Sequence, residues 1–139
     1  LGKPVRSVLD VGCGEGNWRA PLKKLRPSLK YTGVDPSEYA VQRFGRRRNI
    51  IRGSVENLST LSLDRPFDLL ICCGMLNYVP SAQLGASLKA VSGRMGGMAY
   101  LEIFTNGDDT EGDTSWPTSQ SKCTAPVPLR WSDQKRGLG

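Results

Sequence analysis

The stretch that decides the fold is Val8-Leu9-Asp10-Val11-Gly12-Cys13-Gly14-Glu15-Gly16-Asn17-Trp18. It begins as an apolar strand and runs into alternating glycines, which lack a Cβ and tolerate positive φ. Gly12, Gly14 and Gly16 therefore suit a tight strand-to-helix turn whose exposed amides let a nucleotide or cofactor approach closely. The dinucleotide pattern Gly-x-Gly-x-x-Gly would require glycine where this chain has Asn17. The spacing therefore favours a cofactor other than NAD.

Three further stretches follow the glycine turn. They are Tyr31-Thr32-Gly33-Val34-Asp35-Pro36-Ser37, Gly53-Ser54-Val55-Glu56-Asn57-Leu58 and Pro66-Phe67-Asp68-Leu69-Leu70-Ile71-Cys72-Cys73-Gly74-Met75-Leu76-Asn77-Tyr78-Val79-Pro80. In this order, the four stretches make the chain resemble the class I S-adenosylmethionine (SAM)-dependent methyltransferases from about residue 5 to about residue 106. The resemblance implies a Rossmann-like fold, SAM as the cofactor and S-adenosylhomocysteine (SAH) as its product.

The resemblance also implies which residues bind the cofactor. Asp35 ends the second strand, where a carboxylate can accept hydrogen bonds from both ribose hydroxyls; an aspartate that caps the next helix through Pro36 is the alternative. We expect Asp35→Ala to weaken SAM binding with little loss of fold, and Asp35→Asn to be milder. The other implied cofactor-binding residues are Asp10, Gly12, Cys13, Gly14, Gly16, Pro36, Ser54, Val55, Cys73 and Gly74.

These residues would serve different parts of SAM. The glycine turn would face the methionine half, with Asp10 as a supporting carboxylate near the turn or the methionine ammonium. The family often has an acid at the position of Ser54, so the adenine contact is expected from the Val55 backbone with help from Ser54. Cys73 and Gly74 would offer a backbone carbonyl to the ammonium, and strand packing is the alternative for the cysteine.

Catalysis leaves a weaker signal in the sequence than cofactor binding. The chain contains no histidine, so a base would have to be Asp, Glu, Lys, Tyr or Cys. Methyl transfer needs alignment more than a special group, and the catalytic residues stay unknown, with Asn77 and Tyr78 as weak candidates. Cys73-Gly74-Met75-Leu76 stands where amino-methylating enzymes of nucleic acids and glutamine have Asn/Asp-Pro-Pro-aromatic, which favours a small-molecule acceptor.

Two other functions stay open. The first is a non-catalytic SAM- or nucleotide-binding module, or a truncated methyltransferase, because the family's last strands have no recognisable counterpart here. The second is an NAD-linked oxidoreductase, which the glycine spacing disfavours.

Apolar strands and helical stretches alternate along the first 104 residues. Strands are predicted over residues 6–11, 30–34, 49–52, 67–73 and 98–104, and helices over 17–25, 37–44 and 82–92. This alternation predicts an α/β fold, a doubly wound and mainly parallel sheet with helices on both faces. Right-handed crossovers bring the strand C-termini to one rim, so the ligand site is expected where the first and fourth strands meet.

The pattern stops after Phe104. We expect residues 1–106 to form the SAM-binding core and residues 107–139 an irregular tail that is disordered or covers the substrate. Trp116 and Trp131 would be its substrate contacts or loop anchors. An open sheet edge would allow oligomer formation.

Composition limits the remaining classes. The 139 residues fit one domain, no apolar run approaches the roughly 18 residues of a membrane span, and residues 1–4 show no signal peptide. Cys13, Cys72, Cys73 and Cys123 have neither zinc nor disulfide spacing. We therefore expect a cytoplasmic protein without a metal site or a membrane partner.

The net charge of +6 includes two basic runs, Lys23-Lys24-Leu25-Arg26 and Arg46-Arg47-Arg48. Such runs usually lie on solvated helix ends, where cations favour the C-terminus. Nucleic acid is the lesser alternative as a partner, because no aromatic-rich binding surface accompanies the charges.

Overall fold

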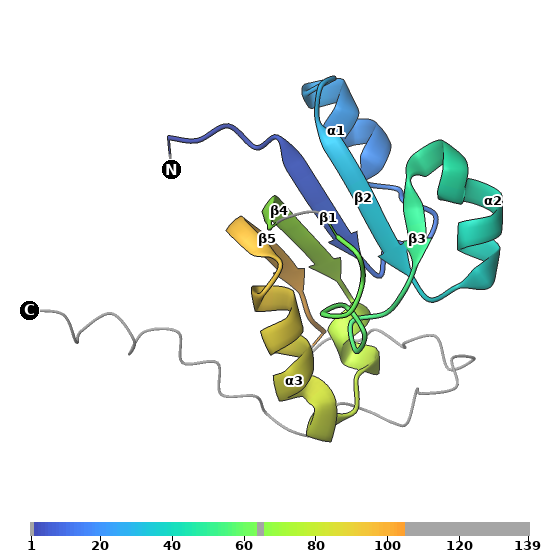
Figure 1. Cartoon of the computed structure of the whole chain (residues 1–139), viewed down its shortest axis with the longest axis vertical. Helices are drawn as coiled ribbons and strands as arrows, with labels where there is room; N and C mark the ends of the chain where they lie inside the picture. Colours follow the sequence, from blue (N-terminus) through green and yellow to red (C-terminus); the bar gives the residue numbers. More distant parts are fainter. Residues whose placement is uncertain (1, 64–65, 105–139) are drawn as a thin grey trace, which may run out of the picture.

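A computed structural model of the chain describes residues 2–63 and 66–104. The elements in chain order are β1 (Ser7–Val11), α1 (Arg19–Leu25), β2 (Lys30–Asp35), α2 (Glu38–Arg48), β3 (Ile50–Arg52), β4 (Phe67–Cys73), the 3-10 helix η1 (Met75–Tyr78), α3 (Ser81–Ser92) and β5 (Met95–Glu102). The strands pair in parallel in the order β3-β2-β1-β4-β5 (Figure 1). The predicted α/β fold with a parallel sheet is confirmed, and β1 lies beside β4 as expected.

Each face of the sheet has its own core, because successive strand residues point to opposite sides. On one face the fully buried Leu9 and Leu70 pack with Val91 of α3. On the other face Val8 packs with Leu22 of α1. The prediction of helices on both faces is therefore confirmed.

Several element boundaries differ from those predicted. Helix α2 continues to Arg48, where Asn49 adopts the left-handed conformation (φ 56°) and donates its N–H to the Gly45 carbonyl. A left-handed residue ends a helix by satisfying its last carbonyls, and asparagine tolerates that conformation better than most residues. Strand β5 begins at Met95 and ends at Glu102, so it is shifted toward the N-terminus of the predicted range.

Strand β5 is an outer strand of the described sheet. Met98, Tyr100 and Leu101 are 41%, 48% and 41% exposed. The described residues contain no strand beyond β5. Residues 105–139, with Trp116, Trp131 and the predicted tail, lie outside the described residues.

The C-terminal ends of the strands define the rim where the site is expected. In the parallel sheet Val11, Asp35, Arg52 and Cys73 are the last residues of β1, β2, β3 and β4. The segments that follow these strands therefore meet at one edge of the molecule (Figure 1).

Candidate cofactor-binding site

The glycine turn after β1 has the backbone that the sequence predicts. Gly12, Gly14 and Gly16 have φ values of 72°, 52° and 77°. The N–H groups of Gly12 and Cys13 donate to the Val34 carbonyl at 2.8 and 3.2 Å, which holds the turn against the end of β2. A Cβ at Gly14 would meet no protein atom within 4 Å. The turn is thus rigidly anchored, and it leaves open space at its middle glycine.

At Gly12, glycine is required because another side chain of the protein packs against it, whereas at Gly14 the space is open. A Cβ there would lie 2.8 Å from both Cβ and Cγ of Met75, the first residue of η1. The close approach joins the turn to the segment after β4. Two stretches that the sequence predicted as parts of one site are therefore packed together.

Asp35 connects the glycine turn to the start of α2. Its carboxylate is 8% exposed, and it accepts hydrogen bonds from Gly14 N at 2.7 Å and from Ser37 N at 2.9 Å, one on each oxygen. Ser37 in turn caps α2 by accepting from Ala40 N at 3.2 Å. An ionised carboxylate can accept about four hydrogen bonds, so both oxygens retain capacity for a ligand. The helix-start role and the ribose role are compatible.

A buried polar group lies beneath the turn. Asp10 is 2% exposed and accepts a hydrogen bond from the Tyr31 hydroxyl at 2.5 Å. Burial raises the pKa of Asp10 to about 6, the hydrogen bond from Tyr31 lowers it, and the charge of Asp35 raises it further. Burial and the same two carboxylates raise the pKa of the Cys13 thiol well above its usual range. The buried surroundings of Cys13 therefore favour its neutral thiol form.

An open cavity of about 350 Å³ lies beside Asp35. Its lining residues come from the end of β3 and from the segments that follow β2 and β3, and they are Pro36, Arg52, Gly53, Ser54 and Asn57. Asn57 Oδ1 accepts from Ser54 N at 2.8 Å, which closes a tight turn in this wall. Of the sequence-predicted residues, Pro36 and Ser54 line the cavity, whereas the side chain of Val55 is fully buried in the core.

Sequence reasoning missed Arg52, Gly53 and Asn57 as lining residues. Gly53 and Asn57 belong to the third stretch, so their position in that stretch was the available signal. Arg52 precedes the stretch as the last residue of β3, and the rule that ligands bind at strand C-termini would have included it.

The end of β4 is held by the backbone of Gly74, which is hydrogen-bonded to the end of β5. Gly74 has φ 67° and donates its N–H to the Glu102 carbonyl at 2.9 Å. Cys73 is partly buried, and burial followed by the charge of Glu102 raises the pKa of its thiol. Burial likewise raises the pKa of Cys72 to about 12. Both cysteines are thus uncharged thiols, and a cofactor contact here would use the backbone.

Asn77 and Tyr78, the weak catalytic candidates, lie in η1. Asn77 Nδ2 donates to the Phe104 carbonyl at 2.9 Å, and Phe104 N donates to Asn77 Oδ1 at 3.1 Å. Both ends of this amide therefore hold the chain beyond β5, which is the loop-packing role. Tyr78 is partly buried at the end of η1.

The two aromatic residues near the motifs pack against protein rings. Trp18 is 42% exposed and contacts Tyr100 edge to face at 6.1 Å between ring centroids. Tyr39 is 60% exposed and contacts Phe44 in the same way. Neither lines the cavity.

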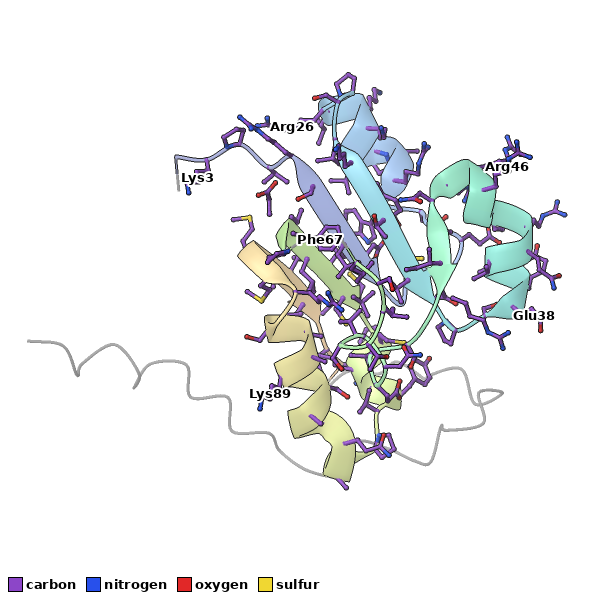
Figure 2. All side chains as sticks on the ribbon, viewed as in Figure 1. Lys3, Arg26, Glu38, Arg46, Phe67 and Lys89 are labelled. Carbon is purple, nitrogen blue, oxygen red and sulfur yellow. The ribbon has the colours of Figure 1, made fainter. Side chains whose placement is uncertain are left out.

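The basic run at the end of α2 behaves as a helix end. The Arg48 guanidinium lies 4.3 Å from the Phe44 ring centroid and donates to the Glu15 carbonyl at 2.6 Å. Arg46 extends away from the sheet on the outer side of α2 (Figure 2).

Among residues 2–63 and 66–104, no group of three or more His, Cys, Asp or Glu side chains could hold a metal ion. In the same part of the chain, no helix is long and apolar enough to cross a membrane.

A family described as a methyltransferase domain matches residues 8–95 of the chain. The chain belongs to this methyltransferase family. It is a class I family whose cofactor is SAM, and NAD-linked chemistry is not implied by the match. No curated protein sequence matches the chain.

Similar solved structures are methyltransferases as well. A SAM-dependent methyltransferase from Archaeoglobus fulgidus is 25% identical with a TM-score of 0.57, over 73% of this chain and 45% of that one. The sugar N-methyltransferase KedS8 from Streptoalloteichus sp ATCC 53650 is 25% identical with a TM-score of 0.63, over 78% and 45%. The plantazolicin methyltransferase BpumL, solved with SAH, is 22% identical with a TM-score of 0.63, over 74% and 40%. This chain spans less than half the length of each.

The described residues fit the family's cofactor on three observations. Space is open at Gly14, the buried Asp35 retains acceptor capacity beside it, and the cavity begins at Pro36, the next residue. All three features lie at the C-terminal ends of β1, β2 and β3.

Proposed function

We propose that the chain binds SAM along the rim of the sheet and transfers its methyl group to a small-molecule acceptor. The observation that carries the proposal is the position of Asp35, which is bonded to Gly14 on one side and adjoins the cavity at Pro36 on the other. A ligand that extends from the glycine turn into the cavity would pass this carboxylate. A ribose between a methionine tail and an adenine matches that order.

The parts of SAM are assigned from this order. Asp35 would accept hydrogen bonds from the two ribose hydroxyls, each charge-assisted bond contributing roughly 1.5–3 kcal/mol. The open side of Gly14 and the Cys73 and Gly74 backbone would face the methionine half, with the buried Asp10 supporting the turn from below. Ser54 and the Val55 backbone would face the adenine.

When bound, SAM supplies a methyl group on a positively charged sulfonium, a leaving group that needs no protonation. The chain's task is therefore to hold the reacting atoms in line and exclude water. Burial raises the pKa of the Cys13 and Cys72 thiols, which disfavours a thiolate at either residue. Asn77, whose amide is already bonded to Phe104, would act by fixing the rim, and Tyr78 stays a weak candidate for contact with the acceptor.

A small-molecule acceptor is supported by the similar structures. They include a sugar N-methyltransferase, an amino pentose methyltransferase and plantazolicin methyltransferases. Cys73-Gly74-Met75-Leu76 also lacks the motif of amino-methylating enzymes that act on nucleic acids and glutamine. A SAM-binding module without transferase activity is the second candidate, because the described residues place no group in a catalytic role.

Calorimetry with SAM, SAH and NAD tests the binding part of the proposal. We expect micromolar or tighter binding of SAM and SAH and no binding of NAD. Asp35→Ala should weaken SAH binding, whereas the control Glu38→Ala should not, because Glu38 is exposed on α2 and its carboxylate accepts a hydrogen bond from the Gln42 amide of the same helix. Tighter binding of NAD than of SAM would refute the proposal.

Release of SAH in the presence of amino sugars and other small amines or alcohols tests the transferase part. SAM binding without turnover across such a panel would favour the binding module.

A further inference from the structure

The side chain of Arg94 donates a cluster of hydrogen bonds to backbone carbonyls that are distant from it in the sequence. Arg94 lies between α3 and β5, and its side chain donates to the loop that follows β3, more than 30 residues earlier. The accepting carbonyls and distances are Leu58 at 3.2 and 2.9 Å, Ser59 at 3.0 Å, Leu61 at 2.8 Å and Leu63 at 3.5 Å. One side chain therefore fixes the backbone of residues 58–63.

The loop needs such a partner because it has no regular structure. Residues 55–60 form consecutive turns, and residues 53–63 contain no helix or strand. Its carbonyls lack the partners that a helix or sheet would supply, although Leu58 is fully buried. A guanidinium carries five donors in a fixed planar arrangement, so it can satisfy several converging carbonyls at once. Arg94 makes no ion pair with residues 2–63 or 66–104, so its described partners are these carbonyl dipoles.

The same loop builds one wall of the cavity. Asn57 precedes the first carbonyl that Arg94 binds, and it holds Ser54 N through Oδ1. The Leu61 side chain packs so closely on Gly53 that a Cβ there would lie 2.6 Å from Leu61 Cδ1. Gly53, Ser54 and Asn57 all line the cavity, whereas Arg94 does not. A movement of residues 58–61 would therefore move all three lining residues.

This wall retains polar groups for a ligand. Within the part of the chain that the structure describes, Ser54 Oγ and Asn57 Nδ2 make no hydrogen bond to other residues. Together they offer donors and an acceptor to the polar edge of a base. Hydrogen bonds discriminate between bases only when donors and acceptors are held at fixed positions.

We propose that Arg94 is a positioning residue that sets the base selectivity of the cofactor site by fixing the cavity wall of Gly53, Ser54 and Asn57. The inference rests on the proposed function, since it requires SAM or SAH in the site. Arg94 acts through the loop and touches neither cofactor nor acceptor.

The test compares two ligands that differ only in the base. SAH carries adenine, and S-inosylhomocysteine carries hypoxanthine, in which a carbonyl replaces the amino group. Calorimetry on the full 139-residue chain would give both dissociation constants for wild type, Arg94→Lys and Arg94→Gln. Arg26→Gln is the control, because this arginine is exposed at the end of α1 and contacts neither the loop nor the cavity.

We expect wild type and Arg26→Gln to prefer SAH by about three- to tenfold or more, the range of one or two neutral hydrogen bonds. Arg94→Gln should lose most of this preference, and Arg94→Lys, which keeps the charge but has fewer donors, should fall between. Thermal melting without ligand would identify the folded variants, and Arg94→Lys carries the test if Arg94→Gln does not fold.

Three results would overturn the inference. The first is a folded Arg94 variant that keeps the wild-type preference, and the second is an equal loss of affinity for both ligands, which is what a purely structural role predicts. The third is a wild type that binds SAH without any preference over S-inosylhomocysteine. A wild type that bound neither ligand would instead refute the proposed function, and with it this inference.

Discussion

Replacement of Asp35 separates the structural and the ligand-binding roles of its carboxylate. In the ligand-free chain the two oxygens accept from Gly14 N and Ser37 N at 2.7 and 2.9 Å, and the side chain is 8% exposed. Asp35→Ala would leave both donors without this acceptor. Each unsatisfied donor costs about 1–3 kcal/mol when buried, and some water will reach the rim, so the free energy of unfolding should fall by about 2–4 kcal/mol. The expectation of little loss of fold, drawn from the sequence, is therefore revised.

Asp35→Asn should remain milder than Asp35→Ala, but it should also reduce stability. An amide presents one oxygen and one NH2 group, so one of the two backbone donors would face another donor. We expect a loss of unfolding free energy of about 1–3 kcal/mol, corresponding to one unsatisfied donor. SAH affinity should fall about ten- to a hundredfold in Asp35→Ala, from two lost charge-assisted bonds, and less in Asp35→Asn.

The assay is urea unfolding without ligand, followed by calorimetry with SAH under conditions where each variant is folded. Glu38→Ala, an exposed carboxylate at the start of the same helix, is the matched control. Unchanged unfolding in both Asp35 variants would refute the structural role. An unchanged dissociation constant in a folded variant would show that the ribose is held elsewhere.

Three further predictions concern the glycine turn and two other carboxylates. Gly14→Ala should cost only about 1 kcal/mol of stability, the cost of a left-handed alanine, yet it should weaken SAH binding about tenfold or more because its Cβ would occupy the proposed ligand space. Gly12→Ala should instead lower stability by about 1–3 kcal/mol, because its Cβ would clash with Met75 of η1. The reverse pattern in thermal melting and calorimetry would contradict both expectations. Asp10 has a folded pKa of about 6 against an ordinary 3.8, so the folded state keeps its proton longer than the unfolded state and the free energy of unfolding should fall as pH rises from 4 to 6. Asp10→Asn should be more stable than wild type by about 2–3 kcal/mol at pH 7 and by much less at pH 4, and a difference that stays constant with pH would count against this. The pKa of Asp68 is lowered because its carboxylate accepts hydrogen bonds from Arg6 N and from Ser7. The carboxylate therefore stabilises the folded state at neutral pH, and this stabilisation is lost as the pH falls below the ordinary carboxyl range. Asp68→Asn should remove this acid dependence in pH-dependent melting, and an unchanged acid midpoint would contradict the expectation.

The parallel α/β fold could be predicted from sequence, and a candidate site could be proposed at one rim, because the signals for both are local. Glycine tolerates positive φ, so alternating glycines after an apolar strand permit a tight turn, and the observed φ values of 72°, 52° and 77° lie in that region. Apolar strands alternating with helices restrict the topology to parallel neighbours with crossovers. Asp35 could be placed at the rim because it directly follows a strand. These inferences need only the order of residues along the chain.

Contacts between distant segments were decided by the tertiary structure. The guanidinium of Arg94 binds backbone carbonyls of residues 58–63, and Asn77 binds the backbone of Phe104. Every residue has a backbone carbonyl and nearly every residue a backbone N–H. When a side chain binds such a group, the residue type of its partner is therefore not constrained, and the sequence gives no sign of the contact. The contact of Met75 with Gly12 is of the same kind, because a glycine that admits a ligand and one that admits a side chain look identical in sequence. Sequence alone therefore determined at which rim the candidate site is expected, because strand order places those residues there. The tertiary structure decided which backbone and side-chain atoms at that rim are already bonded within the protein, because those contacts join segments far apart in the sequence.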